Sequence, residues 1–287
     1  MDSRQVYIGM DVGTDKVGAA AREAVPHHGL DLVRPDERYS AGHFGRDVRR
    51  WVGEIQGRGS LPVLVGGTGF FLRAVTDPIF AEPALDETRR MALRAYFSEQ
   101  PAEVLRRFVT ALDPLRAPLA IEGGPQRMVR TIEVAILSGV ALSRWHRDAP
   151  AEADGLPGLV VVLDLPRDEM DRRIDDRVST MVERGLVEEV QRLLAAGYRD
   201  DDPGMSGTGY REISAHLRGD TTLDDAMQEI RRNTRRYARR QLTWFRNKLS
   251  PAAIWIDATR PVREQVAMLR GALHSAGMTP PTTWVRT

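Results

Sequence analysis

The 287-residue sequence has no cysteine, which excludes disulfide bonds, cysteine-ligated zinc or iron–sulfur sites and a thiol nucleophile. It also lacks long apolar runs, and stretches such as residues 159–163 are far too short to cross a bilayer. Residues 1–5 show no apolar segment typical of a secretory signal, so a cytoplasmic protein without a membrane partner is expected. Neither a fibrous repeat nor a disordered chain fits this composition.

Charge is balanced overall but concentrated locally. The net charge is +1, with 28% charged and 42% apolar residues, which is ordinary for a globular protein with a buried core. Residues 231–248, however, contain eight Arg or Lys residues and no Asp or Glu. A basic segment in a neutral protein predicts either a local anionic partner or a local internal counter-charge.

Short β-type runs alternate with helical patterns, which predicts an α/β fold with a parallel sheet. The run at 61–65 leads into a glycine turn and a helix at 70–75, as at the ligand-binding edge of such sheets. The other expected elements are a strand at 159–163, a helix at 167–183, a helix that follows Gly185 and stops near Gly197, a long amphipathic helix at 224–249 and a late strand at 252–257.

The segment from about residue 82 to 157 differs from the rest of the chain in composition. It is rich in arginine and helix-forming residues, is punctuated by prolines and shows no convincing strand. We therefore predict a helical insertion between two halves of the core. The four predicted parts are a first core segment at 1–81, the insertion at 82–157, a second core segment at 158–273 and a frayed tail at 274–287.

The turn at Gly66-Gly67-Thr68-Gly69 is the first candidate for chemistry. Glycines allow a backbone to approach a ligand closely, and a hydroxyl at a helix N-terminus can contact a phosphate. The alternative is a tight strand-to-helix turn without a ligand. A second candidate is the loop-rich start, residues 2–7 and 9–16, which gathers small, acidic and hydroxyl residues. Its alternative is a solvated chain terminus.

A third candidate is the stretch from Pro125 to Arg130. Arg127 and Arg130 are three residues apart and share a helix face, and Gln126 could read an adenine edge with its donor and acceptor together. The alternative is a salt bridge between Arg130 and Glu133.

The fourth candidate is Gly209-Tyr210-Arg211-Glu212 together with the basic helix that follows. Two adjacent columns of arginine could neutralise several phosphates. The alternative is a solvated helix face, and Trp244 and Phe245 are expected in the core. The adjacent pair His27 and His28 has no third ligand at usable spacing, so no metal site is predicted from the histidines.

In their order and spacing, these stretches resemble the bacterial tRNA dimethylallyltransferase (tRNA isopentenyltransferase) family over about residues 2–257. The stretches that carry the resemblance are residues 2–7, 9–16, Pro26-His27-His28 with Asp31, Tyr39-Ser40-Ala41 with Phe44, residues 62–71, residues 125–130 with Glu133, residues 209–212 and residues 239–246.

The resemblance implies a P-loop-kinase-like core, a parallel sheet flanked by helices, with a helical insertion. It implies transfer of a dimethylallyl group from dimethylallyl diphosphate to the exocyclic amine of the adenosine 3′-adjacent to the anticodon, in tRNAs that read codons beginning with U. The implied partners are the tRNA anticodon stem-loop and dimethylallyl diphosphate, with Mg²⁺ as cofactor, and a monomer is expected.

The resemblance also implies roles for individual residues. Asp2 would be the base that hydrogen-bonds the adenine amine, and Thr68 would position the reacting groups near the leaving oxygen. Gly66, Gly67 and Thr68 would face the diphosphate. The implied tRNA contacts are Asp2, Ser3, Arg4, Gln5, Arg90, Gln126, Arg127, Met128, Val129, Arg130, Gly209, Tyr210, Arg211, Arg239, Arg240, Gln241, Thr243 and Arg246.

The family usually carries a strand and a Gly-x-x-x-x-Gly-Lys-[Ser/Thr] phosphate loop ahead of its Asp-Ser motif, and these 287 residues contain no such loop. We therefore expect a first strand and phosphate loop to be missing, through a late start site or else a truncation, and weak binding of dimethylallyl diphosphate. The alternatives are an adenylate (AMP/ADP) isopentenyltransferase, a non-catalytic tRNA-binding remnant and a nucleotide kinase.

Overall fold

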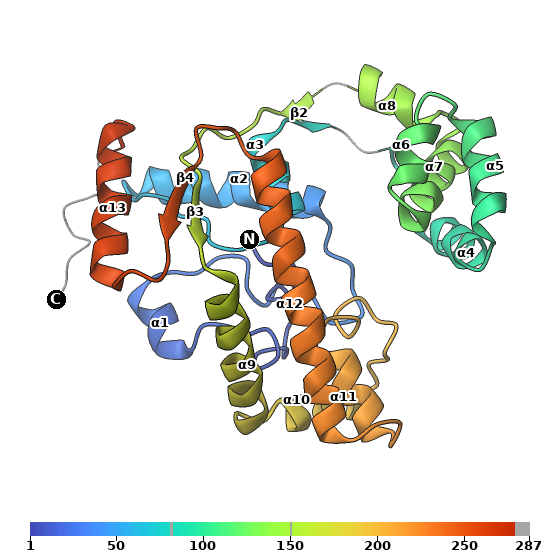
Figure 1. Cartoon of the computed structure of the whole chain (residues 1–287). Helices are drawn as coiled ribbons and strands as arrows, with labels where there is room; N and C mark the ends of the chain where they lie inside the picture. Colours follow the sequence, from blue (N-terminus) through green and yellow to red (C-terminus); the bar gives the residue numbers. More distant parts are fainter. Residues whose placement is uncertain (81–82, 150, 279–287) are drawn as a thin grey trace. The chain divides into compact units, whose positions relative to one another are not determined.

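The computed structural model describes residues 1–80, 83–149 and 151–278 (Figure 1). Contacts within the chain divide it into two compact units. Unit 1 combines residues 1–77 with residues 156–287, and unit 2 comprises residues 78–155. The insertion predicted at 82–157 differs from unit 2 by a few residues at each boundary.

Unit 1 contains mostly helices around one small parallel sheet. Its helices are α1 (Ala19–Ala24), α2 (Ala41–Gly57), α3 (Gly69–Thr76), α9 (Arg167–Glu183), α10 (Leu186–Ala195), α11 (Tyr210–Leu217), α12 (Leu223–Lys248) and α13 (Val262–Ser275). Its strands β3 (Val161–Asp164) and β4 (Ile254–Asp257) pair in parallel, with Val161 opposite Ile254 and Asp164 opposite Asp257. The expectation of an α/β fold with a parallel sheet is confirmed at this level.

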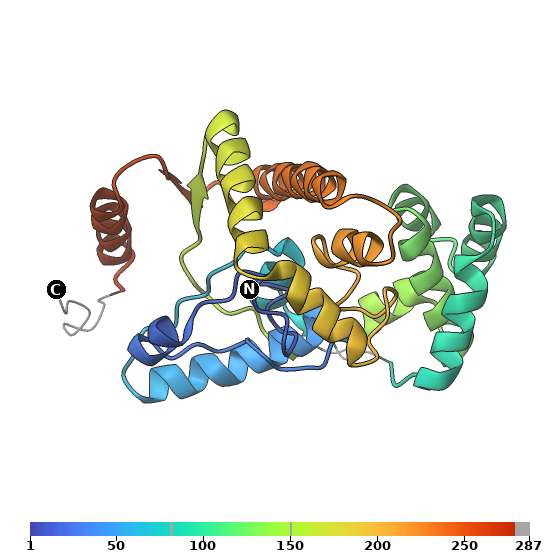
Figure 2. The ribbon, with the colours of Figure 1, turned by 90° about the horizontal axis from the view of Figure 1, so that it is seen from below.

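The main core of unit 1 lies where α9 to α12 pack on the loop-rich start of the chain. Figure 2 shows β3 leading into α9, and α9 continuing through a sharp turn into α10. Gly185 makes that turn with φ at +95°, a conformation that a side chain disfavours. Apolar side chains repeating at helical spacing, among them Ile174, Val178 and Met181 on α9, face Val6 and Met10 in this core.

A smaller core joins α2 to α3. The rings of Phe44 and Phe71 stack 4.2 Å apart, and Val48 and Val75 complete the buried cluster. Arg49 on α2 donates to the carbonyl of Ala74 at 2.8 Å, which ties the two helices together. These contacts fix the start of α3, where the glycine turn of residues 66–69 ends.

Unit 2 is a helical unit with its own core. Its helices are α4 (Glu87–Ser98), α5 (Ala102–Leu112), α6 (Ala117–Glu122), α7 (Pro125–Ser138) and α8 (Leu142–Asp148). Apolar residues of α4, α5 and α6 pack around α7, whose Ile132 is fully buried. The short strands β1 (Ile79–Phe80) and β2 (Ala151–Ala153) pair antiparallel. The prediction of no strand here is therefore wrong. Strands of two and three residues are too short to show an alternation of apolar and polar residues in the sequence.

Two further expectations need correction. Residues 61–65, predicted as a strand, form no strand in the described part of the chain, because a strand requires a hydrogen-bonded neighbour. Val63 and Val65 accordingly remain 57% and 76% exposed. Helix α13 was not predicted and covers the start of the expected tail at 274–287, whose residues 279–287 lie outside the described structure.

None of the helices in the described part of the chain combines the length and the apolar character that crossing a bilayer requires.

Candidate active site

The turn that follows Met1 holds the carboxylate of Asp2 in a fixed position. Its Oδ1 accepts hydrogen bonds from the backbone N–H groups of Arg4 at 2.7 Å and Gln5 at 3.3 Å, as in an Asx turn. No described residue donates to the second oxygen, Oδ2. One face of this half-buried carboxylate is thus available to accept a hydrogen bond from a ligand.

The hydroxyl of Thr68 lies beside this turn. Thr68 precedes α3, and its Oγ1 accepts from the backbone N–H of Ser3 at 3.3 Å and lies 3.5 Å from the Ser3 hydroxyl. The Thr68 N–H donates to the Met1 carbonyl at 3.3 Å. Two segments more than sixty residues apart in sequence are therefore in contact, and Thr68 bonds to the residues on either side of Asp2.

The glycines of the turn allow two other segments to approach it. A side chain on Gly66 would collide with the Met1 backbone, and one on Gly67 would collide with the Gln241 amide. The Gln241 amide donates to the Gly67 carbonyl at 2.7 Å. A Cβ on Gly69 would lie 2.6 Å from the Trp244 ring. Close packing therefore explains these glycines without a phosphate, and a diphosphate contact at Gly66 and Gly67 stays a prediction.

Arg4 and Gln5 already have partners within the protein. The Arg4 guanidinium donates to the Pro203 carbonyl at 2.6 Å, which anchors the loop before α11. The Gln5 amide donates to the carbonyls of Thr14 and Asp15 at 3.1 and 3.2 Å. Both side chains stabilise the loops around the turn, which positions Asp2 and Ser3 indirectly.

A buried lysine holds the loop of residues 9–16. The Lys16 side chain is 1% exposed and contacts Asp31 at 2.5 Å and Asp11 at 3.0 Å. Arg22 also reaches Asp31, at 2.9 Å. Burial would raise the pKa of the Asp31 carboxyl, but hydrogen bonds from Lys16 and Arg22 outweigh burial and hold that pKa below its ordinary value.

Tyr210 has a structural role that the sequence did not reveal. Its side chain is 1% exposed, and its hydroxyl donates to Glu189 Oε1 at 2.6 Å. Glu189 in turn accepts from the backbone N–H groups of Asp11, Val12 and Gly13 at 2.8 to 3.0 Å. Burial and the Glu189 charge raise the pKa of Tyr210, so the phenol stays protonated. The expected tRNA contact through this side chain is therefore corrected to a role inside the core.

Of the residues beside Tyr210, Gly209 and Glu212 are buried as well, whereas Arg211 is exposed. The Gly209 N–H donates to Glu212 at 2.8 Å, and Glu212 also accepts from Asn233 on α12 at 2.9 Å. Arg211 is exposed and donates to the Ser206 carbonyl at 2.9 Å. Of this motif, Arg211 alone presents a charged side chain at the surface.

In unit 2, the predicted tRNA contacts on α7 fall into two groups. Met128 and Val129 are 2% and 4% exposed and belong to the core, so contact through these side chains is corrected. Gln126 is exposed, and Arg127 reaches the Leu119 carbonyl at 3.4 Å. These two side chains and Arg130 can still present polar groups to an RNA.

A buried carboxylate in unit 2 gathers three arginines. Glu133 is fully buried and accepts two hydrogen bonds from Arg94, at 2.6 and 2.9 Å. Arg90 and Arg130 approach the same carboxylate at 3.6 and 3.9 Å. The salt bridge considered between Arg130 and Glu133 is thus present but long. Sequence reasoning missed Arg94, because the pairing joins two helices and shows no local spacing.

On α12, several predicted tRNA contacts pair with acidic residues of the same unit. Arg239 contacts Asp171 at 3.1 Å, and Arg246 contacts Asp164 at 3.4 Å. Arg240 and Thr243 are exposed, and the Arg240 guanidinium lies 5.9 Å from the centre of the Tyr237 ring. The internal counter-charge considered for this basic segment is therefore present, but acidic side chains pair with only some of its arginines.

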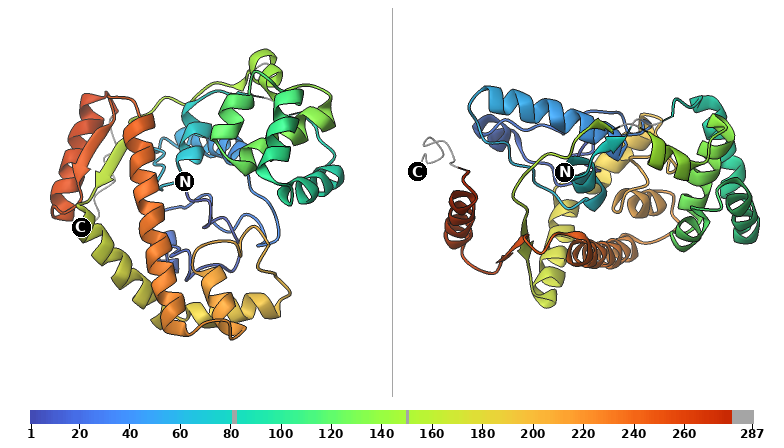
Figure 3. Two further views of the ribbon diagram at one scale, coloured as in Figure 1. Left: turned by 45° about the vertical axis from the view of Figure 1, so that its right-hand side comes forward. Right: turned by 90° about the horizontal axis from the view of Figure 1, so that it is seen from above.

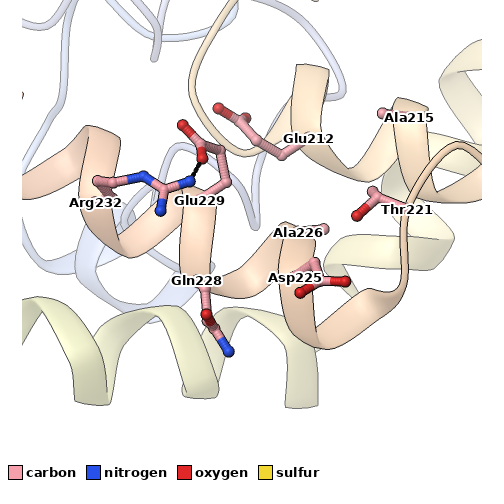
Figure 4. Close-up of a pocket in the computed structure, with 8 residues that line it drawn as sticks. All are labelled: Glu212, Ala215, Thr221, Asp225, Ala226, Gln228, Glu229 and Arg232. Atoms are coloured by element: carbon pink, nitrogen blue, oxygen red, sulfur yellow. Dashed lines mark ion pairs between the residues drawn. The ribbon is translucent and has the colours of Figure 1, made fainter.

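A hollow between α11 and α12 is mainly acidic, in contrast to the basic segment of α12 (Figure 4). It is lined by Glu212, Ala215, Thr221, Asp225, Ala226, Gln228, Glu229 and Arg232. Figure 4 shows the Arg232 guanidinium turned to Glu229, with which it forms an ion pair. Three carboxylates against one arginine make this hollow unsuited to a phosphate.

The residues around Asp2 do not build a protein-held magnesium site. Mg²⁺ prefers oxygen ligands, including one or two carboxylates. Here one carboxylate oxygen of Asp2 is occupied by backbone N–H groups, which leaves its other oxygen and the hydroxyls of Ser3 and Thr68. Across the described ranges, no three His, Asp or Glu side chains gather as a metal site would need.

Comparison with known proteins identifies the family of this chain. Residues 5–248 match the family model described as IPP transferase. The chain is 38% identical over 256 residues to a tRNA dimethylallyltransferase of Geobacter sulfurreducens, covering 89% of this chain and 82% of that protein. It is 41% identical to one of Thermomicrobium roseum, covering 91% and 78%.

Solved structures of similar proteins point to the same family. A tRNA isopentenylpyrophosphate transferase of Bacillus halodurans superposes with a TM-score of 0.64 at 33% identity, covering 96% of this chain and 88% of that one. A eukaryotic dimethylallyltransferase acting on tRNA has a TM-score of 0.78 at 22% identity, covering 98% and 73%, which shows the shared fold. This chain therefore belongs to the IPP transferase family, whose matched members are tRNA dimethylallyltransferases.

Proposed function

We propose that this chain transfers a dimethylallyl group from dimethylallyl diphosphate to the exocyclic amine of the adenosine 3′-adjacent to the anticodon, in tRNAs that read codons beginning with U. The observation that carries the proposal is the contact between the turn that holds Asp2 and the residue that begins α3, where the Ser3 N–H donates to the Thr68 hydroxyl at 3.3 Å. Family membership supplies the class of donor and acceptor.

Asp2 is proposed to act as the base. An adenine amine is a weak nucleophile because its lone pair is delocalised into the ring, so its attack needs a group that accepts a proton. As the new C–N bond forms, the C–O bond to the diphosphate breaks, and the amine proton moves to Asp2. The two backbone N–H groups on Oδ1 orient the carboxylate and leave Oδ2 to receive that proton.

Thr68 and the glycines before it are proposed to face the departing diphosphate. They stand at the N-terminus of α3, where unpaired backbone N–H groups and the helix dipole favour negative charge. The Thr68 hydroxyl can donate to the leaving oxygen as charge develops on it. These residues supply part of a diphosphate site, next to the adenine held by Asp2.

The tRNA would be bound by exposed and half-buried polar side chains, and a base of the single-stranded loop can be extruded into the site at small cost. The proposed contacts are Ser3, Arg90, Gln126, Arg127, Arg130, Arg211, Arg240 and Thr243. We further propose a P-loop-kinase-like core, Mg²⁺ bound with the diphosphate, a monomeric state and a cytoplasmic location.

The test is a transfer assay with dimethylallyl diphosphate, Mg²⁺ and an anticodon stem-loop RNA, read by mass spectrometry of the nucleosides. We expect prenylated adenosine with the unaltered chain, and at least a hundredfold slower transfer for Asp2→Asn, since general-base catalysis contributes about 10² to 10⁴ in rate. An RNA with guanosine in place of the target adenosine should remain unmodified.

Other outcomes would contradict the proposal. Prenylation of free AMP in place of the RNA would indicate an adenylate isopentenyltransferase. Salt-dependent RNA binding without any transfer would indicate a binding protein without catalysis. Full transfer activity in Asp2→Asn would remove the carboxylate from the mechanism.

A further inference from the structure

Helix α12 carries two neighbouring columns of arginine whose surroundings differ. The inner column is Arg231, Arg235 and Arg239, and the outer column is Arg232, Arg236 and Arg240. Within each column the spacing is four residues, so its members project from one side of the helix. Figure 3 shows α9 lying alongside α12, and the inner column meets this helix.

The inner column is neutralised by α9. Arg235 forms an ion pair with Asp175, and Arg239 forms one with Asp171 at 3.1 Å. Arg231 donates to the Ser179 hydroxyl at 3.0 Å and approaches Asp175 at 4.0 Å. Asp171 and Asp175 thus hold the three guanidinium groups in place, and moving these groups onto a ligand would break packing between the two helices.

The outer column is exposed and mostly lacks counter-charge. Arg232 pairs with Glu229 one turn earlier on the same helix, and Arg240 lies against the Tyr237 ring. Arg236, between them, has no ion pair with any carboxylate in the described residues. The hollow on this side of α12 is lined by Arg232, Arg236, Arg239, Arg240, Thr243, Trp244, Asn247 and Lys248, with no acidic side chain among them.

This hollow runs toward the candidate active site. The ring of Trp244, which lines the hollow, lies against Gly69, and Gln241 on the same helix donates to the Gly67 carbonyl. Both contacts flank Thr68. From Arg232 to Arg240 the helix rises by about 12 Å, which is enough to follow several phosphates of one strand.

We propose that the outer column, with Arg236 at its centre, binds the sugar-phosphate backbone of the RNA that leads to the base held at Asp2 and Thr68. The inner column is structural. This inference rests on the proposed function, because it takes the partner to be RNA. It adds Arg236, Asn247 and Lys248 to the binding surface, together with Arg232, which lines both hollows and pairs with Glu229. Arg239 also lines the basic hollow, but its ion pair with Asp171 assigns it to the structural column.

The experiment compares Arg236→Gln with Arg235→Gln, which removes the same charge from the neighbouring column. The affinity for an anticodon stem-loop RNA is measured at several salt concentrations. For Arg236→Gln we expect the slope of log affinity against log salt to fall by about one, and the melting temperature to stay unchanged. For Arg235→Gln we expect an unchanged slope and a lower melting temperature. Arg236→Lys keeps the charge and should restore the slope.

Equal loss of slope in both variants would overturn the division into columns, because charge would then act without regard to position. An unchanged slope in Arg236→Gln, with the unaltered chain still binding the RNA, would overturn the inference and leave the proposed function standing. Absence of salt-dependent RNA binding by the unaltered chain would overturn both.

Discussion

At the scale of single residues, Glu189 and Tyr210 organise the loop that lies behind the candidate active site. One carboxylate accepts three backbone N–H groups of residues 11–13 and the phenol of Tyr210. A Cβ on Gly13 would lie 2.6 Å from the tyrosine ring, so the glycine and the ring fit each other. This assembly fixes the loop that follows the Asp2 turn.

We expect Tyr210→Phe to lower the free energy of unfolding by about 1.5 to 3 kcal/mol, because it removes a buried hydrogen bond to a charged group. Urea unfolding would measure the change. Tyr237→Phe is the matched control, since that side chain is 43% exposed, and it should change stability little. Equal losses in the two variants would contradict the role of the Tyr210 hydroxyl.

Acid should weaken the fold through Asp31. Its pKa is lower in the folded chain than in the unfolded one, so the folded state binds fewer protons. The resulting stabilisation is present above the ordinary carboxyl pKa of about 3.9 and is lost as the pH falls through the lower folded value. Asp31→Asn should therefore flatten the fall in melting temperature below about pH 4, whereas Asp36→Asn, on an exposed turn, should leave it unchanged.

The sequence predicted the members of the candidate site better than their contacts. Asp2 and Thr68 were chosen by resemblance, and the structure brings the segments that hold them into contact, while their roles stay predictions. Met128, Val129 and Tyr210 stand in the same motifs and are buried. A short motif does not show which of its side chains face the core, because that depends on neighbours distant in sequence.

At the scale of elements, the turn at residues 66–69 depends on contact with α12. Gly69→Ala should lower stability by about 1 to 3 kcal/mol, because the new methyl group would press on the Trp244 ring. Gly53→Ala is the matched control within α2, where a Cβ meets nothing within 4 Å, and it should stabilise by about 0.5 to 1 kcal/mol. Thermal melts of both would test the contact, and a neutral Gly69→Ala would contradict it.

Long helices whose apolar residues recur at helical spacing over several turns were predictable from the sequence. The helix predicted at 167–183 has those bounds, and the helix predicted at 224–249 spans Leu223–Lys248. The run at 61–65 has the residues of a strand, but pairing decides whether a strand forms, and pairing is not local. Helix α13 was missed although Val262, Val266 and Leu269 recur at helical spacing.

At the scale of the whole molecule, each unit has its own core, so damage in one core should remain in that unit. Glu133→Gln leaves three arginines without their buried carboxylate, which should cost about 3 to 5 kcal/mol. Hydrogen exchange should accelerate in α4 and α7 and stay unchanged in α9 and α12. Faster exchange in both units would contradict the independence of their cores. The control is Glu103→Gln, because Glu103 forms an exposed ion pair with Arg106 and its loss should leave exchange in both units unchanged.

The burial of Lys16 has a practical consequence for labelling. The sequence contains two lysines, Lys16 and Lys248, and 39 of its 41 basic residues are arginines. Lys16 is enclosed by Asp11 and Asp31, whereas Lys248 is exposed at the end of α12 and lines the basic hollow. Among the lysines, an amine-directed fluorophore or cross-linker would therefore attach at Lys248, next to the surface on which RNA is proposed to lie.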